Sequence, residues 1–167
     1  KGRLRGGHVY LGGAYGPSVT GTANVMMAAV LAEGKTTIEN AACEPEIEDL
    51  ANFLVAMGAT IDGIGTPRLR ITGVPELDGA VHKVIPDRIE AGTYALAGAI
   101  TGGTVRLKKA RLDHLACVTD RLEEIGVHCE QKGDELIVTP NGSAEGGFKA
   151  VDVTTLPYPG FPTDLQA

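Results

Sequence analysis

Residues 34–62, GKTTIENAACEPEIEDLANFLVAMGATID, contain a short β-like run, an amphipathic helix pattern and a helix-ending glycine. In this stretch, Ile47, Leu50, Leu54 and Met57 recur at steps of three, four and three, which places them on one face of a helix. Gly58 follows as a typical left-handed C-cap. The same order returns in GTVRLKKA and LDHLACVTDRLEEIGVHCE, which begin at residues 103 and 112. The sequence therefore predicts a repeated unit.

Further elements extend the unit in both directions. Each amphipathic helix is followed by two strand-like runs. The β-like run before it is itself preceded by a helix that is apolar on nearly all sides, TANVMMAAVLAEG in the first copy and TYALAGAITGG in the second. Such helices are expected to be buried. Three strand-like stretches lead the copies: HVYL (8–11), VHKVI (81–85) and AVDVTTLP (150–157). We therefore predict an α/β fold of β-α-β-α-β-β units, with two copies nearly complete and a third just begun.

The last residues repeat a strand-to-helix junction. Asp164 occupies the place that Ser18 holds in the first copy and Asp87 in the second, and all three residue types are good helix N-caps. Asp87 also begins a capping-box pattern that ends at Glu90. The third buried helix is thus expected to begin at Asp164 and to be cut short after one turn, so we interpret the chain as a piece of a longer protein.

Composition excludes several classes of protein. The 167 residues carry a net charge of −6, which argues against a broad basic face for nucleic acid. No apolar run approaches the length of a membrane span, and the N-terminus lacks a signal peptide. Three cysteines without CxxC spacing are typical of reduced thiols rather than of disulfides or zinc ligands. We therefore expect a cytoplasmic protein without a metal site.

Three long strings resemble one known family. GPSVTGTANVMMAAVLAEGKTTIENAACEPEIEDLANFLVAMGA, VIPDRIEAGTY and PGFPTDLQA are similar to the UDP-N-acetylglucosamine enolpyruvyl transferases, over essentially the whole chain. The resemblance implies an inverse α/β barrel of two domains, each with three β-α-β-α-β-β units, and an active site in the cleft between them. This chain would hold the last unit of one domain (1–84) and the truncated beginning of the second (85–167).

The resemblance also implies an activity and its substrates. The family transfers the enolpyruvyl group of phosphoenolpyruvate to the 3-hydroxyl of UDP-N-acetylglucosamine, the first committed step of peptidoglycan synthesis, and no cofactor is implied. The reactive cysteine of the family lies on a loop N-terminal to this region, and Cys43, Cys117 and Cys129 do not match it. Two alternatives stay open: a catalytically silent relative that binds a UDP-sugar and has a regulatory role, and an enzyme like the 5-enolpyruvylshikimate-3-phosphate synthases.

Asp164 is the candidate catalytic residue. By local pattern alone it is a helix cap. The family's FPTD aspartate lies over the sugar 3-hydroxyl as candidate general base, so the resemblance implies that Asp164 binds substrate and accepts the proton, which a carboxylate can do.

Ser18, Val19 and Thr20 are the candidate sugar-nucleotide residues. They open the first apolar helix, and its free N–H groups and dipole favour an anion, although a plain turn and cap explains the string as well. In the family this segment binds the UDP part. The chain departs from the family pattern at Gly16, where many members carry lysine, and at Thr20, where glycine is usual.

Four further charged residues are expected to have supporting roles. Glu44 and Glu46 belong to an acidic run that is compatible with a metal site or with paired carboxylates, but an acidic first helix turn explains it more simply. The family pattern keeps this pair and Asp87-Arg88 near the domain junction. We therefore interpret Glu44, Glu46, Asp87 and Arg88 as a polar network around the site.

Overall fold

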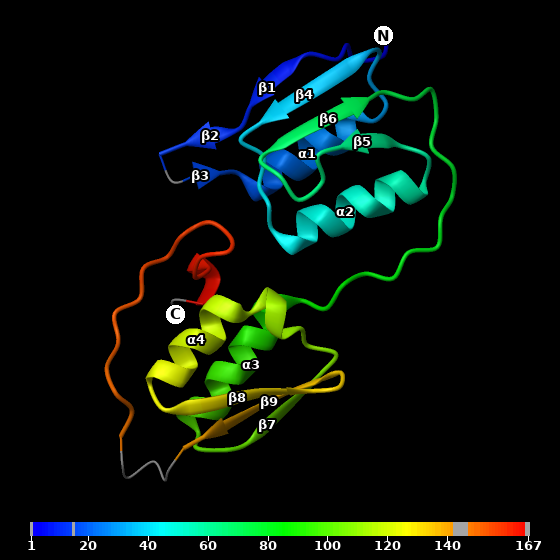
Figure 1. Ribbon diagram of the computed structural model, residues 1–167. Helices are drawn as coiled ribbons and strands as arrows, with labels where there is room; N and C mark the ends of the chain where they lie inside the picture. Colours follow the sequence, from blue (N-terminus) through cyan, green and yellow to red (C-terminus); the bar gives the residue numbers. More distant parts are fainter. Residues whose placement is uncertain (1, 15, 142–146, 166–167) are drawn as a thin grey trace. The chain divides into compact units, whose positions relative to one another are not determined.

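The computed structural model describes residues 2–14, 16–141 and 147–165, which divide into two compact units, 1–85 and 86–167. Each unit places two helices on a small sheet (Figure 1). The elements of the first unit are β1 (His8–Tyr10), β2 (Gly12–Gly13), β3 (Gly16–Pro17), α1 (Val19–Ala29), β4 (Lys35–Glu39), α2 (Pro45–Ala56), β5 (Thr60–Asp62) and β6 (Arg68–Thr72). Those of the second are α3 (Arg88–Ile100), β7 (Val105–Lys108), the 3₁₀ turn η1 (Leu112–His114), α4 (Ala116–Glu124), β8 (Val127–Lys132), β9 (Glu135–Pro140) and the 3₁₀ turn η3 (Thr163–Leu165).

The first unit contains the complete predicted repeat. Its main sheet has the order β1-β4-β6-β5, in which β1 runs parallel to β4 and the other pairs are antiparallel. Burial alternates along β4 and β6, so one face of the sheet is covered and the other faces solvent. Met26 from α1 and Leu54 from α2 join Ile38, Leu69 and Ile71 of the sheet in one core. The order of elements, β-α-β-α-β-β, is confirmed.

The second unit repeats this plan without a leading strand. Its sheet has the order β7-β9-β8, which matches β4-β6-β5 of the first unit strand for strand. Leu115, Val118 and Leu122 from the α4 region pack with Leu136 and Val138 of β9. The predicted C-cap glycines are confirmed, because Gly58 and Gly126 have φ values of 102° and 99°.

Two predicted leading strands are absent from the described residues. Residues 81–85 form no strand because their segment is attached to the first unit. The Asp78 amide donates to the Met57 carbonyl at 2.8 Å, and His82 Nε2 lies 2.9 Å from Asp49 Oδ1. The His82 ring also contacts Phe53, with 5.1 Å between the ring centroids.

Residues 150–157 likewise form no strand. Their one ladder contact is an isolated bridge between Thr155 and Phe161. In the first unit the leading strand is stabilised by pairing with β4. No described strand lies beside residues 150–157, and an extended segment without a partner gains no ladder hydrogen bonds.

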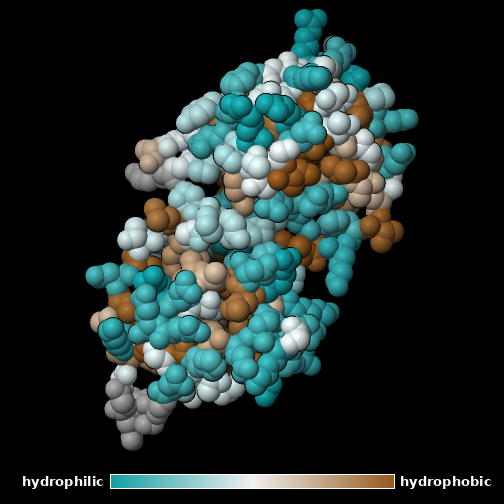
Figure 2. Space-filling view, viewed as in Figure 1, coloured by the Kyte–Doolittle hydropathy of each residue, from teal (hydrophilic) through white to brown (hydrophobic). Residues whose placement is uncertain are grey.

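The two apolar helices are also less buried than predicted. Met27 of α1 and Leu31, which follows that helix, are 43% and 42% exposed, and Tyr94 and Ile100 of α3 are 56% and 76% exposed. α1 packs on its sheet and on α2, and α3 packs on its sheet, on α4 and on the η3 turn, so these side chains stay open to solvent. Figure 2 shows hydrophobic residues exposed between hydrophilic ones on the visible surface of each unit.

The predicted N-caps of α1 and α3 are confirmed. Ser18 Oγ accepts a hydrogen bond from the Gly21 amide at 3.0 Å. One carboxylate oxygen of Asp87 accepts two, from Ile89 at 2.8 Å and from Glu90 at 3.0 Å. These contacts satisfy amides that have no partner within the helix.

Substituting Asp87 by alanine is expected to lower the free energy of unfolding by about 1 kcal/mol. The reason is that the Ile89 and Glu90 amides lose their acceptor. Urea unfolding of wild type, Asp87→Ala and Asp87→Ser measures the change, and serine is expected to restore most of the loss because it keeps a cap oxygen. Equal losses for alanine and serine would contradict a capping role.

Candidate active site

The first candidate cluster is the start of α1. Ser18, Val19 and Thr20 form its first turn, which contains no acidic residue. The turn therefore presents free amides and the positive end of the helix dipole without a competing carboxylate. Gly16, just before it, has a φ of 103°, which L side chains rarely adopt. A lysine in this backbone conformation would be strained.

Thr22 joins this turn to the segment before α2. Its side chain is fully buried, and its Oγ1 donates to the Ser18 carbonyl at 2.8 Å and accepts from the Ala42 amide at 2.9 Å. The Thr22 contacts thereby hold the start of α1 beside Ala42. Asn40 of the same segment is bound to the residue that follows β1, because its Nδ2 donates to the Leu11 carbonyl at 3.2 Å.

Glu44 lies at the end of this segment, where it precedes the first residue of α2. It is only 6% exposed, makes no side-chain cap hydrogen bond, and its Oε2 has no hydrogen-bond partner among the described residues. A buried carboxylate oxygen without a partner is costly. Glu46 follows as an exposed residue in the acidic first turn of α2, as the simpler interpretation predicted.

The second candidate cluster surrounds Asp164 in the second unit. Asp164 is exposed and lies inside η3, whereas the neighbouring Leu165 is buried. Leu165 packs against α3 at Gly92, where an added Cβ would lie 2.7 Å from Leu165 Cδ1. The predicted cap of a third helix at Asp164 depends on the amides of residues 166 and 167, which lie outside the described residues.

Asp87 and Arg88 lie at the start of the same helix, α3. Asp87 caps the helix, and the Arg88 guanidinium carbon lies 5.4 Å from the centroid of the Tyr158 ring. This is a cation–π distance. Arg88 thus contacts the segment that leads to Asp164, a contact that no local sequence pattern predicted.

The predicted site residues therefore form two groups. Ser18, Val19, Thr20, Glu44 and Glu46 belong to the first unit. Asp87, Arg88 and Asp164 belong to the second unit, where the contact of Arg88 with Tyr158 joins the start of α3 to the loop that carries Asp164. Gly92 is the sequence signal that could have revealed the packing of Leu165 on α3, because a glycine inside an apolar helix often marks a close approach.

The thiols of Cys43, Cys117 and Cys129 are not activated as nucleophiles. Burial raises the pKa of Cys43 and of Cys117, and burial with a contribution from Glu123 raises the pKa of Cys129 to about 11. Protonated thiols are poor nucleophiles.

Among the described residues, no group of three or more histidine, cysteine, aspartate or glutamate side chains could hold a metal ion. Of the helices in the described ranges, none combines the length and apolar character needed to cross a lipid bilayer.

Comparison with known proteins defines the class to which this fold and site belong. Residues 3–167 match the sequence profile of the EPSP synthase (3-phosphoshikimate 1-carboxyvinyltransferase) family. The chain belongs to this family of enolpyruvate transferases. The solved enolpyruvyl transferase NikO from Streptomyces tendae is similar, with a TM-score of 0.62 and 26% identity over 73% of this chain and 30% of that one. EPSP synthase from Acinetobacter baumannii, with a TM-score of 0.56 and 21% identity over 83% of this chain and 32% of that one, supports the fold alone.

Curated relatives narrow the resemblance further. A protein of Granulibacter bethesdensis named UDP-N-acetylglucosamine 1-carboxyvinyltransferase is 56% identical over 167 residues, which is 100% of this chain and 38% of the relative. One from Caldanaerobacter subterraneus, named UDP-N-acetylglucosamine 1-carboxyvinyltransferase 1, is 54% identical over 165 residues, with 99% and 38% covered. The family resemblance inferred from the motifs is confirmed. The chain spans 38% of the length of these relatives.

Proposed function

We propose that the full-length protein transfers the enolpyruvyl group of phosphoenolpyruvate to the 3-hydroxyl of UDP-N-acetylglucosamine and releases phosphate. The observation that carries this proposal is the 50–56% identity, over nearly the whole chain, to relatives named UDP-N-acetylglucosamine 1-carboxyvinyltransferase. The reaction would be the first committed step of peptidoglycan synthesis, in the cytoplasm, and would support cell shape and division.

Asp164 is proposed as the general base. Its carboxylate is exposed, and the short η3 turn is anchored by the buried Leu165, so the group can meet a substrate while its backbone stays fixed. As the sugar hydroxyl attacks C2 of phosphoenolpyruvate, the carboxylate would take the hydroxyl proton. C3 of phosphoenolpyruvate would gain a proton from an acid elsewhere in the full-length protein. The resulting tetrahedral intermediate would then lose a proton from C3 and release phosphate, which restores the carbon–carbon double bond.

Ser18, Val19 and Thr20 are proposed to bind the diphosphate of the sugar nucleotide. The proposal is supported by the open first turn of α1, whose amides and dipole attract anions and whose first turn has no acidic residue to repel them. No direct lysine contact from position 16 takes part, because that residue is glycine.

Glu44, Glu46, Asp87 and Arg88 are proposed to form a polar network around the site. The unpartnered buried oxygen of Glu44 supports this role, since a donor from elsewhere in the full-length protein would satisfy it. We further propose that residues 1–84 are the last repeat of one domain and 85–167 the beginning of the next. The exposed apolar sides of α1 and α3 would then be covered by helices of the other repeats.

An acceptor assay on the full-length protein tests the proposed reaction. Phosphate release from phosphoenolpyruvate is expected with UDP-N-acetylglucosamine and not with shikimate 3-phosphate. The opposite preference would assign enolpyruvyl transfer to shikimate 3-phosphate. That reaction is tested because the matched family is named after EPSP synthase. Binding of the UDP-sugar without phosphate release would assign a silent, regulatory relative. Reactions that lack one substrate are the controls.

A further inference from the structure

Residues 155–165, here called the Asp164 loop, are folded tightly on themselves. The Leu156 amide donates to the Phe161 carbonyl at 3.0 Å, and the Gly160 amide donates to the Pro157 carbonyl at 2.8 Å. At Gly160 an added Cβ would lie 2.5 Å from the Leu156 Cβ. The loop therefore has little internal freedom, and its contacts with the helices decide where it places Asp164.

Three contacts attach the loop to helices of the same unit. Leu165 packs on Gly92, and Tyr158 lies under Arg88, so both of these contacts involve α3. The third comes from α4, where Cys117 Sγ lies 3.2 Å from the Gly160 carbonyl oxygen and donates a hydrogen bond to it. This thiol hydrogen bond joins positions 43 residues apart in the chain.

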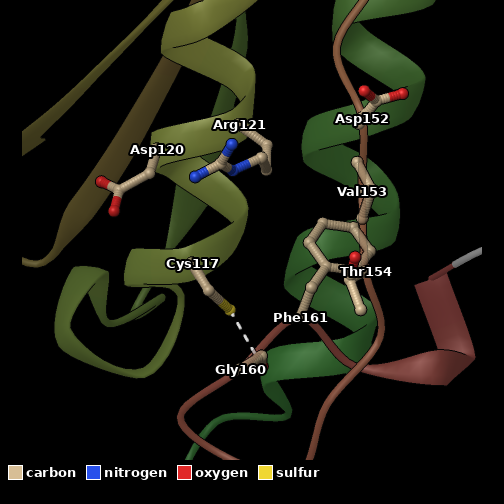
Figure 3. Close-up of a pocket in the computed structure, with 8 residues that line it drawn as sticks. All are labelled: Cys117, Asp120, Arg121, Asp152, Val153, Thr154, Gly160 and Phe161. Atoms are coloured by element: carbon tan, nitrogen blue, oxygen red, sulfur yellow. Dashed lines mark hydrogen bonds between the residues drawn. The ribbon is translucent and has the colours of Figure 1, made fainter.

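The thiol contact borders a hollow in the surface. A pocket of about 330 Å³ is lined by α4 residues on one side and by residues 152–154 and Phe161 on the other. Figure 3 shows the Cys117 side chain pointing at Gly160 at the edge of this pocket. Because open space lies beside the bond, the loop is free to shift on this side when the bond is lost.

We propose that Cys117 is a positioning residue, whose hydrogen bond to the Gly160 carbonyl fixes the Asp164 loop for proton transfer. The inference rests on the proposed function of Asp164. Burial raises the pKa of the Cys117 thiol, so the group remains protonated at neutral pH and able to donate. A thiol is a weak donor, but general-base catalysis depends on sub-ångström placement of the carboxylate.

Removing the donor in the full-length protein tests this role. Cys117→Ala is expected to lower kcat roughly fivefold, with KM for both substrates within about twofold of wild type, because positioning affects the chemical step more than binding. Cys117→Ser keeps a donor and is expected to restore kcat. Cys117→Val fills the space without donating and is expected to behave like alanine. Cys129→Ala, which removes a buried thiol of β8, is the control for a general loss of packing.

Hydrogen exchange of peptides from residues 155–165 gives a readout independent of activity. Faster exchange is expected in Cys117→Ala and Cys117→Val but not in Cys117→Ser. If serine loses as much kcat as alanine, or if alanine leaves both kcat and exchange unchanged, the positioning role is overturned. An inactive Asp164→Ala beside a fully active Cys117→Ala rejects this inference alone, whereas an active Asp164→Ala rejects the proposed base itself.

Discussion

Replacing Asp164 by alanine in the full-length protein is expected to lower kcat by about 10²- to 10⁴-fold, the range typical for loss of a general base. The acceptor hydroxyl would then have no carboxylate to take its proton when it attacks phosphoenolpyruvate. The side chain is exposed, and the η3 turn is held by Leu165 rather than by Asp164, so the fold should be unaffected. Steady-state kinetics and the thermal unfolding midpoint measure the two effects separately.

Two further variants sharpen this test. Asp164→Asn keeps the size and hydrogen-bonding capacity of the side chain but cannot accept the proton, so it should be nearly as slow as alanine. Asp134→Ala removes another exposed carboxylate of the same unit, in the turn between β8 and β9, and should leave kcat unchanged. A rate near wild type in Asp164→Ala would remove this residue from the role of base.

Much of the fold could be predicted because the repeat rests on local rules. Apolar spacing specifies α2 and α4, and Gly58 and Gly126 end them with positive φ. The correspondence extends to detail that no pattern predicted. Asn40 and Lys109, which are equivalent in the two copies, both have positive φ, at 55° and 62°. A non-glycine residue in this conformation is uncommon, so its recurrence indicates that the same backbone turn follows β4 in the first copy and β7 in the second.

The errors concern elements whose formation depends on distant partners. VHKVI has the alternation of a strand, but the contact of His82 with Asp49 and Phe53 attaches it to α2 of the first unit. The spacing of apolar residues also cannot tell what covers a helix. It predicted full burial for α1 and α3, whereas only part of each surface is covered by the described residues.

Some features of the candidate site follow from local sequence, and others depend on tertiary packing. The caps at Ser18 and Asp87 follow from residue type and position, and both are present. The assignment of Asp164 as base came from a family string, and its local pattern alone indicates only a cap. The contacts that hold its loop, from Arg88 and Cys117, join residues 70 and 43 positions apart in sequence. Such contacts arise from tertiary packing and have no local signature.

The largest effect on stability is expected from Gly73→Ala, with a loss of about 3 kcal/mol in the free energy of unfolding. Gly73 follows β6, and a Cβ added there would lie 1.7 Å from the Ala32 carbonyl oxygen. The clash involves backbone and buried structure, because Ala32 is only 3% exposed, so no side-chain rotation relieves it. The two backbone segments must instead move apart.

That separation would break hydrogen bonds that join the residues after β6 to residues 30–34, which connect α1 to β4. The Gly73 amide donates to the Gly34 carbonyl at 2.9 Å, and the Val74 amide donates to the Val30 carbonyl at 2.8 Å. Gly79→Ala is the matched control, since an added Cβ meets nothing within 4 Å there, and its effect should stay within about 0.5 kcal/mol. Urea midpoints of the two variants provide the comparison. Equal midpoints would mean that residues 30–34 and 73–74 do not approach each other this closely. A large gap would confirm that glycine is required at position 73 by backbone proximity, and not by its φ, since Gly73 does not adopt a positive φ.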